Sequence, residues 1–259
     1  AALEGGRHGF AFGSGSAATL TLLHTLRPGD HVISGDDVYG GTFRLFDKVL
    51  KPMGVATTFV DMRDVTRVEQ AITDKTRLVW METPTNPLLK LFDIRKIAAI
   101  AKGKGLPLVV DNTFASPMLQ RPLELGATVV MHSTTKYING HSDVVGGALV
   151  TSDEALAERI RFLQNAIGAV PSPMDCYLVL RGLRTLHARM AVHERNAAAV
   201  RTMLAAHPAV AAVHHPSLPS HPGHAVAARQ QRLFGGIVTF EVHGGAAAAE
   251  TFMSSLTLF

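Results

Sequence analysis

Two charged residues in this sequence follow apolar runs, a position in which catalytic residues are often found. Asp111 comes directly after the apolar run 106–110, and Lys136 follows the apolar run 127–132 within Ser133-Thr134-Thr135-Lys136. A carboxylate at the end of a buried strand is costly unless it meets a positive partner. The lysine stands beside hydroxyl side chains at the mouth of what we expect to be a neighbouring strand.

These residue types match what pyridoxal phosphate (PLP) requires of a protein. A lysine amine forms a Schiff base with the cofactor, and an aspartate pairs with its protonated pyridine nitrogen, which keeps the ring an electron sink. Ser133 and Thr135 lie three and one residues before Lys136 and can donate to phosphate oxygens. Each feature alone is a weak signal, but together they predict PLP on Lys136.

A glycine-containing segment, 13–16, opens an expected helix and supplies a second phosphate contact. Small residues let backbone N–H groups approach a phosphate at the positive end of a helix, so Gly15 and Ser16 are predicted donors. The segment also fits the dinucleotide pattern Gly-x-Gly-x-x-Ala, with Asp36 about twenty residues later. A nucleotide-dependent oxidoreductase is therefore a remote alternative. We argue against it because 9–12 is too short and glycine-flanked for a core strand, and because it leaves Asp111 and Lys136 unexplained.

Helical and strand-like segments alternate regularly through the first 151 residues. Strands rich in Val, Ile and Leu without polar alternation are typical of parallel sheets that helices cover on both faces. The sequence therefore predicts an α/β fold with a mostly parallel sheet between helices. The expected helices are 15–26, 41–50, 65–72 and 94–102, and the expected strands are 31–34, 55–60, 77–82, 106–110, 127–132 and 144–151. Ligands bind beyond the carboxyl ends of such strands, which directs attention to Asp36, Thr83, Asp111 and Ser133.

After about residue 152 the pattern becomes mainly helical, with a later strand at 236–242. We place a boundary near residue 188: 1–187 is predicted to be a large PLP-binding domain, and 188–259 the start of a smaller C-terminal α/β domain. Because the sequence opens without an initiator Met, we expect both ends to be incomplete. Four histidines between 214 and 224 match no ligand spacing, so no metal site is expected.

Composition excludes several classes of protein. The net charge of +4 is dispersed, without the basic cluster that nucleic-acid binding needs. Cys176 is the single cysteine, so no intrachain disulfide can form. No apolar run approaches the roughly 18 to 20 residues of a membrane span, and no signal peptide is readable. We expect a cytoplasmic protein without nucleic-acid or membrane partners.

Five short motifs carry a resemblance to a known family. They are 37–42 (DVYGGT), 82–87 (ETPTNP), 109–114 (VVDNTF), 133–137 (STTKY) and 139–144 (NGHSDV). Along essentially the whole chain the sequence resembles the Cys/Met metabolism family of PLP-dependent enzymes. The resemblance implies the type I, aspartate aminotransferase-like fold. It also implies an N-terminal arm that reaches a neighbouring subunit's phosphate and a C-terminal arginine for the substrate carboxylate, and both lie outside this sequence.

The resemblance also implies roles for individual residues. Lys136 is the Schiff-base lysine and proton shuttle, Asp111 faces the pyridine nitrogen, and Tyr39 stacks on the ring as the acid–base partner. Thr113 lies near the ring, and Asn86 lies near the ring hydroxyl or the substrate carboxylate. The phosphate is held by Gly15, Ser16, Ser133 and Thr135.

Within the family, the segment 168–178 (GAVPSPMDCYL) resembles the cystathionine γ-lyase branch most. That branch converts cystathionine to cysteine, 2-oxobutanoate and ammonia by α,γ-elimination. Methionine γ-lyases carry a cysteine where this sequence has Gly41, which counts against that branch. The alternatives are cystathionine γ-synthase or a related homoserine-ester enzyme and, more remotely, a non-catalytic cofactor-binding protein. The resemblance implies a homotetramer, a dimer of dimers with shared active sites.

Overall fold

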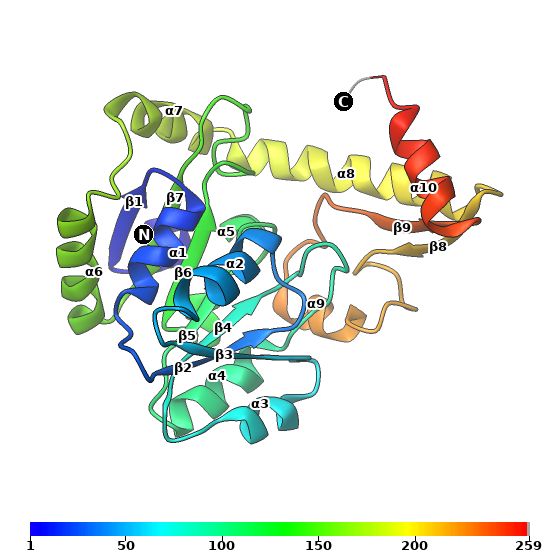
Figure 1. The fold of residues 1–259 in the computed structure, drawn as a ribbon. Coiled ribbons are helices and arrows are strands. Elements are labelled where there is room, and N and C mark those ends of the chain that lie inside the picture. Colours follow the sequence, from blue (N-terminus) through cyan, green and yellow to red (C-terminus); the bar gives the residue numbers. More distant parts are fainter. Residues whose placement is uncertain (258–259) are drawn as a thin grey trace.

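The computed structural model describes residues 1–257 and contains two sheets (Figure 1). A seven-stranded sheet has the order β1-β7-β6-β5-β4-β2-β3, and a two-stranded sheet pairs β8 with β9. The strands are β1 (His8–Phe12), β2 (His31–Gly35), β3 (Ala56–Val60), β4 (Thr76–Glu82), β5 (Leu108–Asp111), β6 (Val129–Ser133), β7 (Gly147–Thr151), β8 (Val210–His214) and β9 (Thr239–Val242).

Helices follow most strands and cover the large sheet. The α-helices are α1 (Gly15–Leu23), α2 (Gly40–Arg44), α3 (Val65–Ala71), α4 (Ile94–Gly103), α5 (Ser116–Leu119), α6 (Glu154–Ile167), α7 (Pro173–Leu183), α8 (Leu186–Ala205), α9 (His224–Gln230) and α10 (Gly245–Ser254). Two short 3-10 helices, η1 (Ala2–Glu4) and η3 (Pro122–Leu125), and one π-helix, η2 (Leu45–Leu50), complete the set.

The strands β2 to β6 pair in parallel, so their carboxyl ends lie at one edge of the sheet. The strands β1 and β7 pair in the antiparallel direction. Because β4, β5 and β6 are neighbours, the loops after Glu82, Asp111 and Ser133 meet at that edge. The predicted α/β architecture with a mostly parallel sheet is confirmed.

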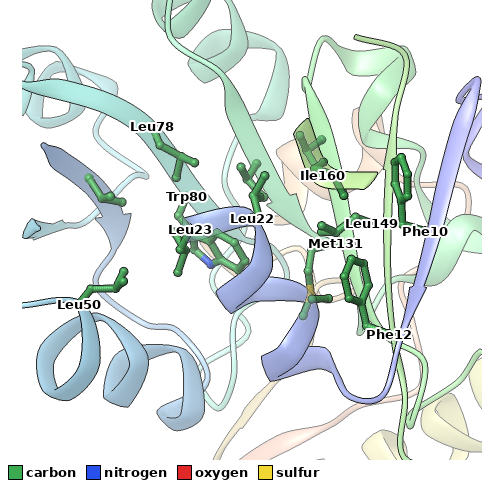
Figure 2. Packing of buried hydrophobic residues seen from close by; sticks show 14 of the residues in the cluster. Phe10, Phe12, Leu22, Leu23, Leu50, Leu78, Trp80, Met131, Leu149 and Ile160 are labelled. Carbon is green, nitrogen blue, oxygen red and sulfur yellow. The ribbon is translucent and has the colours of Figure 1, made fainter. Parts of the chain in front are cut away.

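Each central strand buries both of its faces. Trp80 and Val109 pack into one apolar cluster with α1, η2 and α6, while Met81 and Val110 pack into a second cluster with α3 and α4. Figure 2 shows Trp80 in the first cluster beside Leu22 and Leu23 of α1. This two-sided burial explains why the strands read as continuous apolar runs. It also makes the sheet a rigid base for the loops at its carboxyl edge.

One prediction about local structure is wrong. The segment 9–12 was not expected to be a core strand, but β1 spans it, with Phe10 and Phe12 buried. It pairs along its whole length with β7 at the edge of the sheet, despite the flanking glycines. Because β1 pairs only with β7 at the edge of the sheet, far from β2, the two strands on either side of α1 are not the adjacent parallel pair of a dinucleotide fold. The position of β1 in the sheet, and not the length of the segment, therefore excludes the dinucleotide fold.

Smaller differences occur elsewhere. The predicted helix 41–50 is α2 followed by the π-helix η2, and the strand β8 was not expected. The predicted boundary at residue 188 falls inside α8, the long helix that runs from the large sheet toward β8 and β9 (Figure 1). None of the helices within residues 1–257 has the length and apolar character needed to cross a membrane.

Candidate functional site

A cavity of about 360 Å³ opens at the carboxyl edge of the parallel strands. The nine residues predicted to form the site all line it. They are Gly15, Ser16, Tyr39, Asn86, Asp111, Thr113, Ser133, Thr135 and Lys136. They come from five separate stretches of the chain, which the sheet brings to one place. Their individual roles stay predictions.

Asp111 forms the buried base of the cavity. The backbone N–H and the Oγ1 hydroxyl of Thr113 both donate to Asp111 Oδ1, at 3.0 and 2.6 Å. No protein group among residues 1–257 hydrogen-bonds to Oδ2, although Asp111 is only 7 % exposed. Burial raises the pKa of Asp111, and the two bonds from Thr113 oppose that rise. A cationic partner at Oδ2 would stabilise the ionised form, which is what a protonated ring nitrogen offers.

Lys136 lies in the turn that follows β6. The Thr113 hydroxyl accepts the Ser133 N–H at 2.8 Å, so the base of the site and the start of this turn are linked. Thr135 Oγ1 accepts the Gly146 N–H at 3.1 Å, which ties the turn to the segment entering β7. The Lys136 side chain is exposed and lines the cavity. The lysine is therefore accessible while its backbone is held from the sheet side.

The glycine-containing turn before α1 packs against the start of the Lys136 turn, and both line the cavity. Ser14 caps α1 by accepting the Ala17 N–H at 3.0 Å. A Cβ added to Gly15 would lie 2.9 Å from Ser133 Cβ, closer than side chains normally approach. Glycine is therefore required at position 15 for these two segments to come together. Backbone N–H groups at the positive end of α1 and the nearby hydroxyls form a cradle suited to a phosphate.

Tyr39 precedes α2, lines the cavity and is 49 % exposed. A Cβ at Gly41 would overlap the Tyr39 ring. The ring therefore lies directly over the Gly41 backbone. A side chain at position 41 must displace Tyr39, which gives a physical reason for the glycine there.

Glu82 is a residue of the site that the sequence reasoning missed. It ends β4, lines the cavity, and accepts the Tyr39 N–H on Oε2 at 2.8 Å. Burial and the charge of Asp111 raise the pKa of Glu82 well above its ordinary value, against hydrogen bonds from the backbones of Tyr39 and Asn86. The signal was available, because Glu82, like Asp111, ends an apolar strand. The rule that directs attention to the residue after each strand selects Thr83 instead of Glu82.

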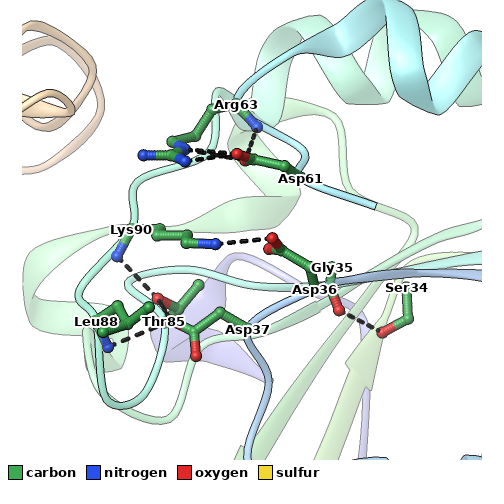
Figure 3. A network of polar contacts seen from close by, with 9 residues as sticks. All are labelled: Ser34, Gly35, Asp36, Asp37, Asp61, Arg63, Thr85, Leu88 and Lys90. Carbon is green, nitrogen blue, oxygen red and sulfur yellow. Dashed lines mark hydrogen bonds and ion pairs between the residues drawn. The ribbon is translucent and has the colours of Figure 1, made fainter. Parts of the chain in front are cut away.

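Polar contacts join the two loops that carry Tyr39 and Asn86 (Figure 3). Asp37 Oδ2 accepts the Thr85 hydroxyl at 2.5 Å and the Leu88 N–H at 3.2 Å. Lys90 Nζ pairs with Asp36 Oδ2 at 2.8 Å. Asp36 is therefore used within this network and does not line the cavity. The network fixes the loops on which Tyr39 and Asn86 stand.

Thr83 also lies outside the cavity, because it is buried and its Oγ1 accepts the Phe92 N–H at 3.0 Å. The four histidines of 214–224 were expected to bind no metal. Within the described part of the chain, no group of three or more His, Cys, Asp or Glu side chains is arranged to hold a metal ion. His214 instead pairs with Glu241 at 2.7 Å.

The residues present fit PLP. A buried carboxylate with a free oxygen, an accessible lysine and a small-residue cradle at a helix terminus lie around one cavity. These are the partners that the ring nitrogen, the aldehyde and the phosphate of PLP require.

Comparisons with known proteins agree with this chemistry. The family model described as "Cys/Met metabolism PLP-dependent enzyme" matches residues 1–259. The chain is 55% identical to a probable cystathionine γ-synthase of Herpetosiphon aurantiacus, over 100% of this chain and 81% of that protein. It is 51% identical to a cystathionine γ-lyase of Dictyostelium discoideum, over 100% and 67%. The crystal structure of MetB from Corynebacterium glutamicum superposes with a TM-score of 0.97 at 51% identity, over 100% of this chain and 67% of that one.

Proposed function

The chain belongs to the Cys/Met metabolism family of PLP-dependent enzymes, and from that premise we propose that it makes or breaks the bond between the γ-carbon and the sulfur of cystathionine. Its cofactor is PLP, and its fold is the type I fold that the resemblance implied. The observation that carries the proposal is the convergence of Lys136, Asp111 and Tyr39 on one cavity.

The residues around the cavity divide into those that would hold the ring and those that would hold the phosphate. Lys136 Nζ would bond to the aldehyde carbon, which its position in the cavity lining supports, and Asp111 Oδ2 would pair with the ring nitrogen. Tyr39 stacks on the ring, Thr113 lies near it, and Asn86 serves the ring hydroxyl or the substrate carboxylate. The phosphate contacts are assigned to Gly15, Ser16, Ser133 and Thr135.

Once bound, PLP supplies an electron sink for the pair left on the substrate when a proton is removed. Lys136 Nζ takes the α-proton, and Asp111 keeps its negative charge against the ring nitrogen. For the sulfur to leave, a second proton must come off the β-carbon, and the electron pair left there would form the double bond between the β- and γ-carbons as the carbon–sulfur bond breaks. Tyr39 Oη or Lys136 Nζ would then give the departing sulfur its proton. In the elimination direction, cystathionine and water give cysteine, 2-oxobutanoate and ammonia.

Two directions use these same residues. Cleavage is the direction that the resemblance of 168–178 to γ-lyases favours. Formation is the second candidate, because the relative named a probable γ-synthase is 55% identical and the one named a γ-lyase 51% identical. In formation, cysteine sulfur replaces the oxygen leaving group of a homoserine ester at the γ-carbon.

Product analysis on the full-length protein separates the directions. Cystathionine alone is supplied to one sample, and a homoserine ester with cysteine to another. Release of 2-oxobutanoate from cystathionine supports the lyase, and appearance of cystathionine in the second sample supports the synthase. If neither sample turns over while the protein holds PLP, the proposal of γ-carbon chemistry on cystathionine is wrong.

We also propose that the site is completed by a second subunit. Among the described residues that line the cavity, Lys136 is the only Lys or Arg, and its amine is assigned to the aldehyde. A phosphate dianion near a protein surface is usually contacted by Arg or Lys. A homotetramer built from dimers that share sites would supply those cations across an isologous interface. The division at residue 188, into a large PLP domain and a smaller second domain, is part of the same proposal.

A further inference from the structure

The turn that follows Lys136 is held from outside the sheet by one arginine, Arg189 of α8. Its Nη1 donates to the carbonyl of Tyr137 at 2.6 Å, and its Nη2 donates to the carbonyls of Ile138 at 3.3 Å and Gly182 at 2.8 Å. Its Nε donates to Thr185 Oγ1 at 3.1 Å. One guanidinium therefore joins the Lys136 turn to the end of α7 and the start of α8.

In the part of the chain that the structure describes, the guanidinium of Arg189 is not neutralised in the usual way, by an acidic side chain. No carboxylate among residues 1–257 forms an ion pair with Arg189, and burial lowers the pKa of its guanidinium. The charge is compensated by main-chain carbonyls instead, one of which, that of Gly182, belongs to the last turn of α7. The carbonyl end of a helix attracts cations, and hydrogen bonds from a charged donor are stronger than neutral ones.

Two glycines make the close approach possible. Gly140 has a φ of +72°, which favours glycine, and a Cβ there would overlap the Arg189 guanidinium. A Cβ at Gly182 would overlap the carbonyl oxygen of Asn139. The backbone of the turn therefore packs directly against α7 and α8, with no side chain between them.

The contact reaches Lys136 through the turn's own hydrogen bonds. The Gly140 N–H donates to the carbonyl of Lys136 at 2.8 Å, and the Asn139 N–H donates to the carbonyl of Thr134 at 2.9 Å. From the sheet side, the Thr134 N–H donates to the carbonyl of Gly146 at 2.9 Å. Lys136 thus lies in a turn held on one side by the entry to β7 and on the other by Arg189.

We propose that Arg189 is a positioning residue for Lys136: its fork of donors fixes the turn 137–140 and so sets the direction of the Lys136 amine into the cavity. The inference rests on the proposed function in one respect, namely that Lys136 carries the cofactor. It goes further because Arg189 does not line the cavity and its effect passes only through the backbone. Charge alone is insufficient for this role, since three carbonyls need the planar, multi-donor geometry of a guanidinium.

The test compares Arg189→Lys with Arg195→Lys in the full-length PLP enzyme. Arg195 lies on the same helix and is exposed, so its variant controls for changing an arginine of α8. Arg189→Lys is expected to speed amide hydrogen exchange in 137–140 and to lower kcat at least about tenfold, the effect of losing one charge-assisted hydrogen bond. The pH midpoint of the cofactor's visible band should also move, while Arg195→Lys changes none of these.

A second variant approaches the contact from the other side. Gly140→Ala keeps the arginine at position 189, but the added Cβ displaces its guanidinium from the turn. Faster exchange in 137–140, a lower kcat and a shifted pH midpoint are therefore expected here too. This variant is informative even if Arg189→Lys folds poorly. Wild-type exchange in 137–140 together with a wild-type pH midpoint in either folded variant would overturn the inference, whatever the melting temperature.

Borohydride labelling separates this inference from the proposed function. If the label is on Lys136 in the wild type and in Arg189→Lys, but exchange in 137–140 and the midpoint are unchanged, only the inference about Arg189 fails. If the wild-type label is on another lysine, the proposed function fails first.

Discussion

Glu82 and Asp111 lie side by side in register at the ends of the parallel strands β4 and β5, and both side chains are at least nine-tenths buried. Two neighbouring carboxyl groups in such a place do not both ionise readily. Asp111 retains a free oxygen toward the cavity, whereas Glu82 is turned to the backbone of Tyr39. We interpret the pair as one carboxylate for the cofactor and one carboxylic acid that holds the adjacent loop.

The first prediction concerns Glu82→Gln. Because the folded state raises the pKa of Glu82, its protonated form stabilises the protein fully below the ordinary value of 4.5, and this contribution is lost as pH rises through the folded pKa. The free energy of unfolding of the cofactor-free wild type should therefore fall, relative to that of Glu82→Gln, as pH increases from 4.5. Urea unfolding at a series of pH values measures it.

Glu69→Gln serves as the matched control, since Glu69 is exposed on α3. Its stability difference from the wild type should show no comparable slope. If the curves of the wild type and Glu82→Gln stay parallel over that pH range, Glu82 is not held as the acid. Glu82→Ala, which also removes the acceptor for the Tyr39 N–H, is expected to destabilise more than Glu82→Gln.

The second prediction concerns Asp111→Asn. The amide keeps the size of the side chain and an acceptor for Thr113, so the fold and some bound cofactor should remain. It cannot hold a proton on the ring nitrogen. A charge-assisted hydrogen bond contributes roughly 1.5–3 kcal/mol, so a loss of at least about tenfold in kcat is expected. Steady-state kinetics at saturating PLP measures the loss, and wild-type rates would remove Asp111 from this role.

The third prediction concerns Lys136→Ala. Without the amine the protein should lose essentially all turnover and the visible band of covalently bound PLP. The side chain is exposed and its truncation leaves the backbone contacts of the turn intact, so the melting temperature should change little. Absorbance, activity and thermal unfolding on one preparation check all three. Substantial turnover in the variant would show that another lysine does the work.

The fourth prediction concerns assembly. Because the cavity lacks a second cation among its described lining residues, we expect a homotetramer whose sites are completed between subunits. Light scattering on the full-length protein gives the mass. A stable monomer with full activity would contradict the shared site and would require a phosphate partner elsewhere in the chain.

Much of the site could be predicted because its signals are local. Asp111 and Lys136 each lie at or just after the carboxyl end of a buried strand. Because these strands are parallel neighbours, the two residues lie at the same edge of the sheet, independent of the loops that connect the strands. The fold class followed from the same alternation of strand and helix. The sequence also predicted that Gly15 lies in a phosphate-binding turn. The reason that position 15 must be glycine, its close approach to Ser133, is seen only in the three-dimensional structure.

The rest depended on contacts between distant segments. The strand β1 forms because β7 pairs with it, and its glycines hide it from any local pattern. Glu82 gained its importance from its register with Asp111, and Arg189 from three carbonyls that no sequence motif marks. Propensity and periodicity do not report pairing partners, so β1 and the role of Arg189 could not be predicted. The position of Glu82 at a strand end was visible in the sequence, but its register with Asp111 was not.

The central claim is that Lys136 carries PLP, and borohydride reduction tests it most directly. The full-length protein, purified with its cofactor, is reduced and digested, and the peptide that retains the pyridoxyl group is sequenced by mass spectrometry. The account predicts the label on Lys136, with loss of the visible band and of activity in proportion to labelling. A label on any other lysine, or activity that survives complete reduction, would contradict it.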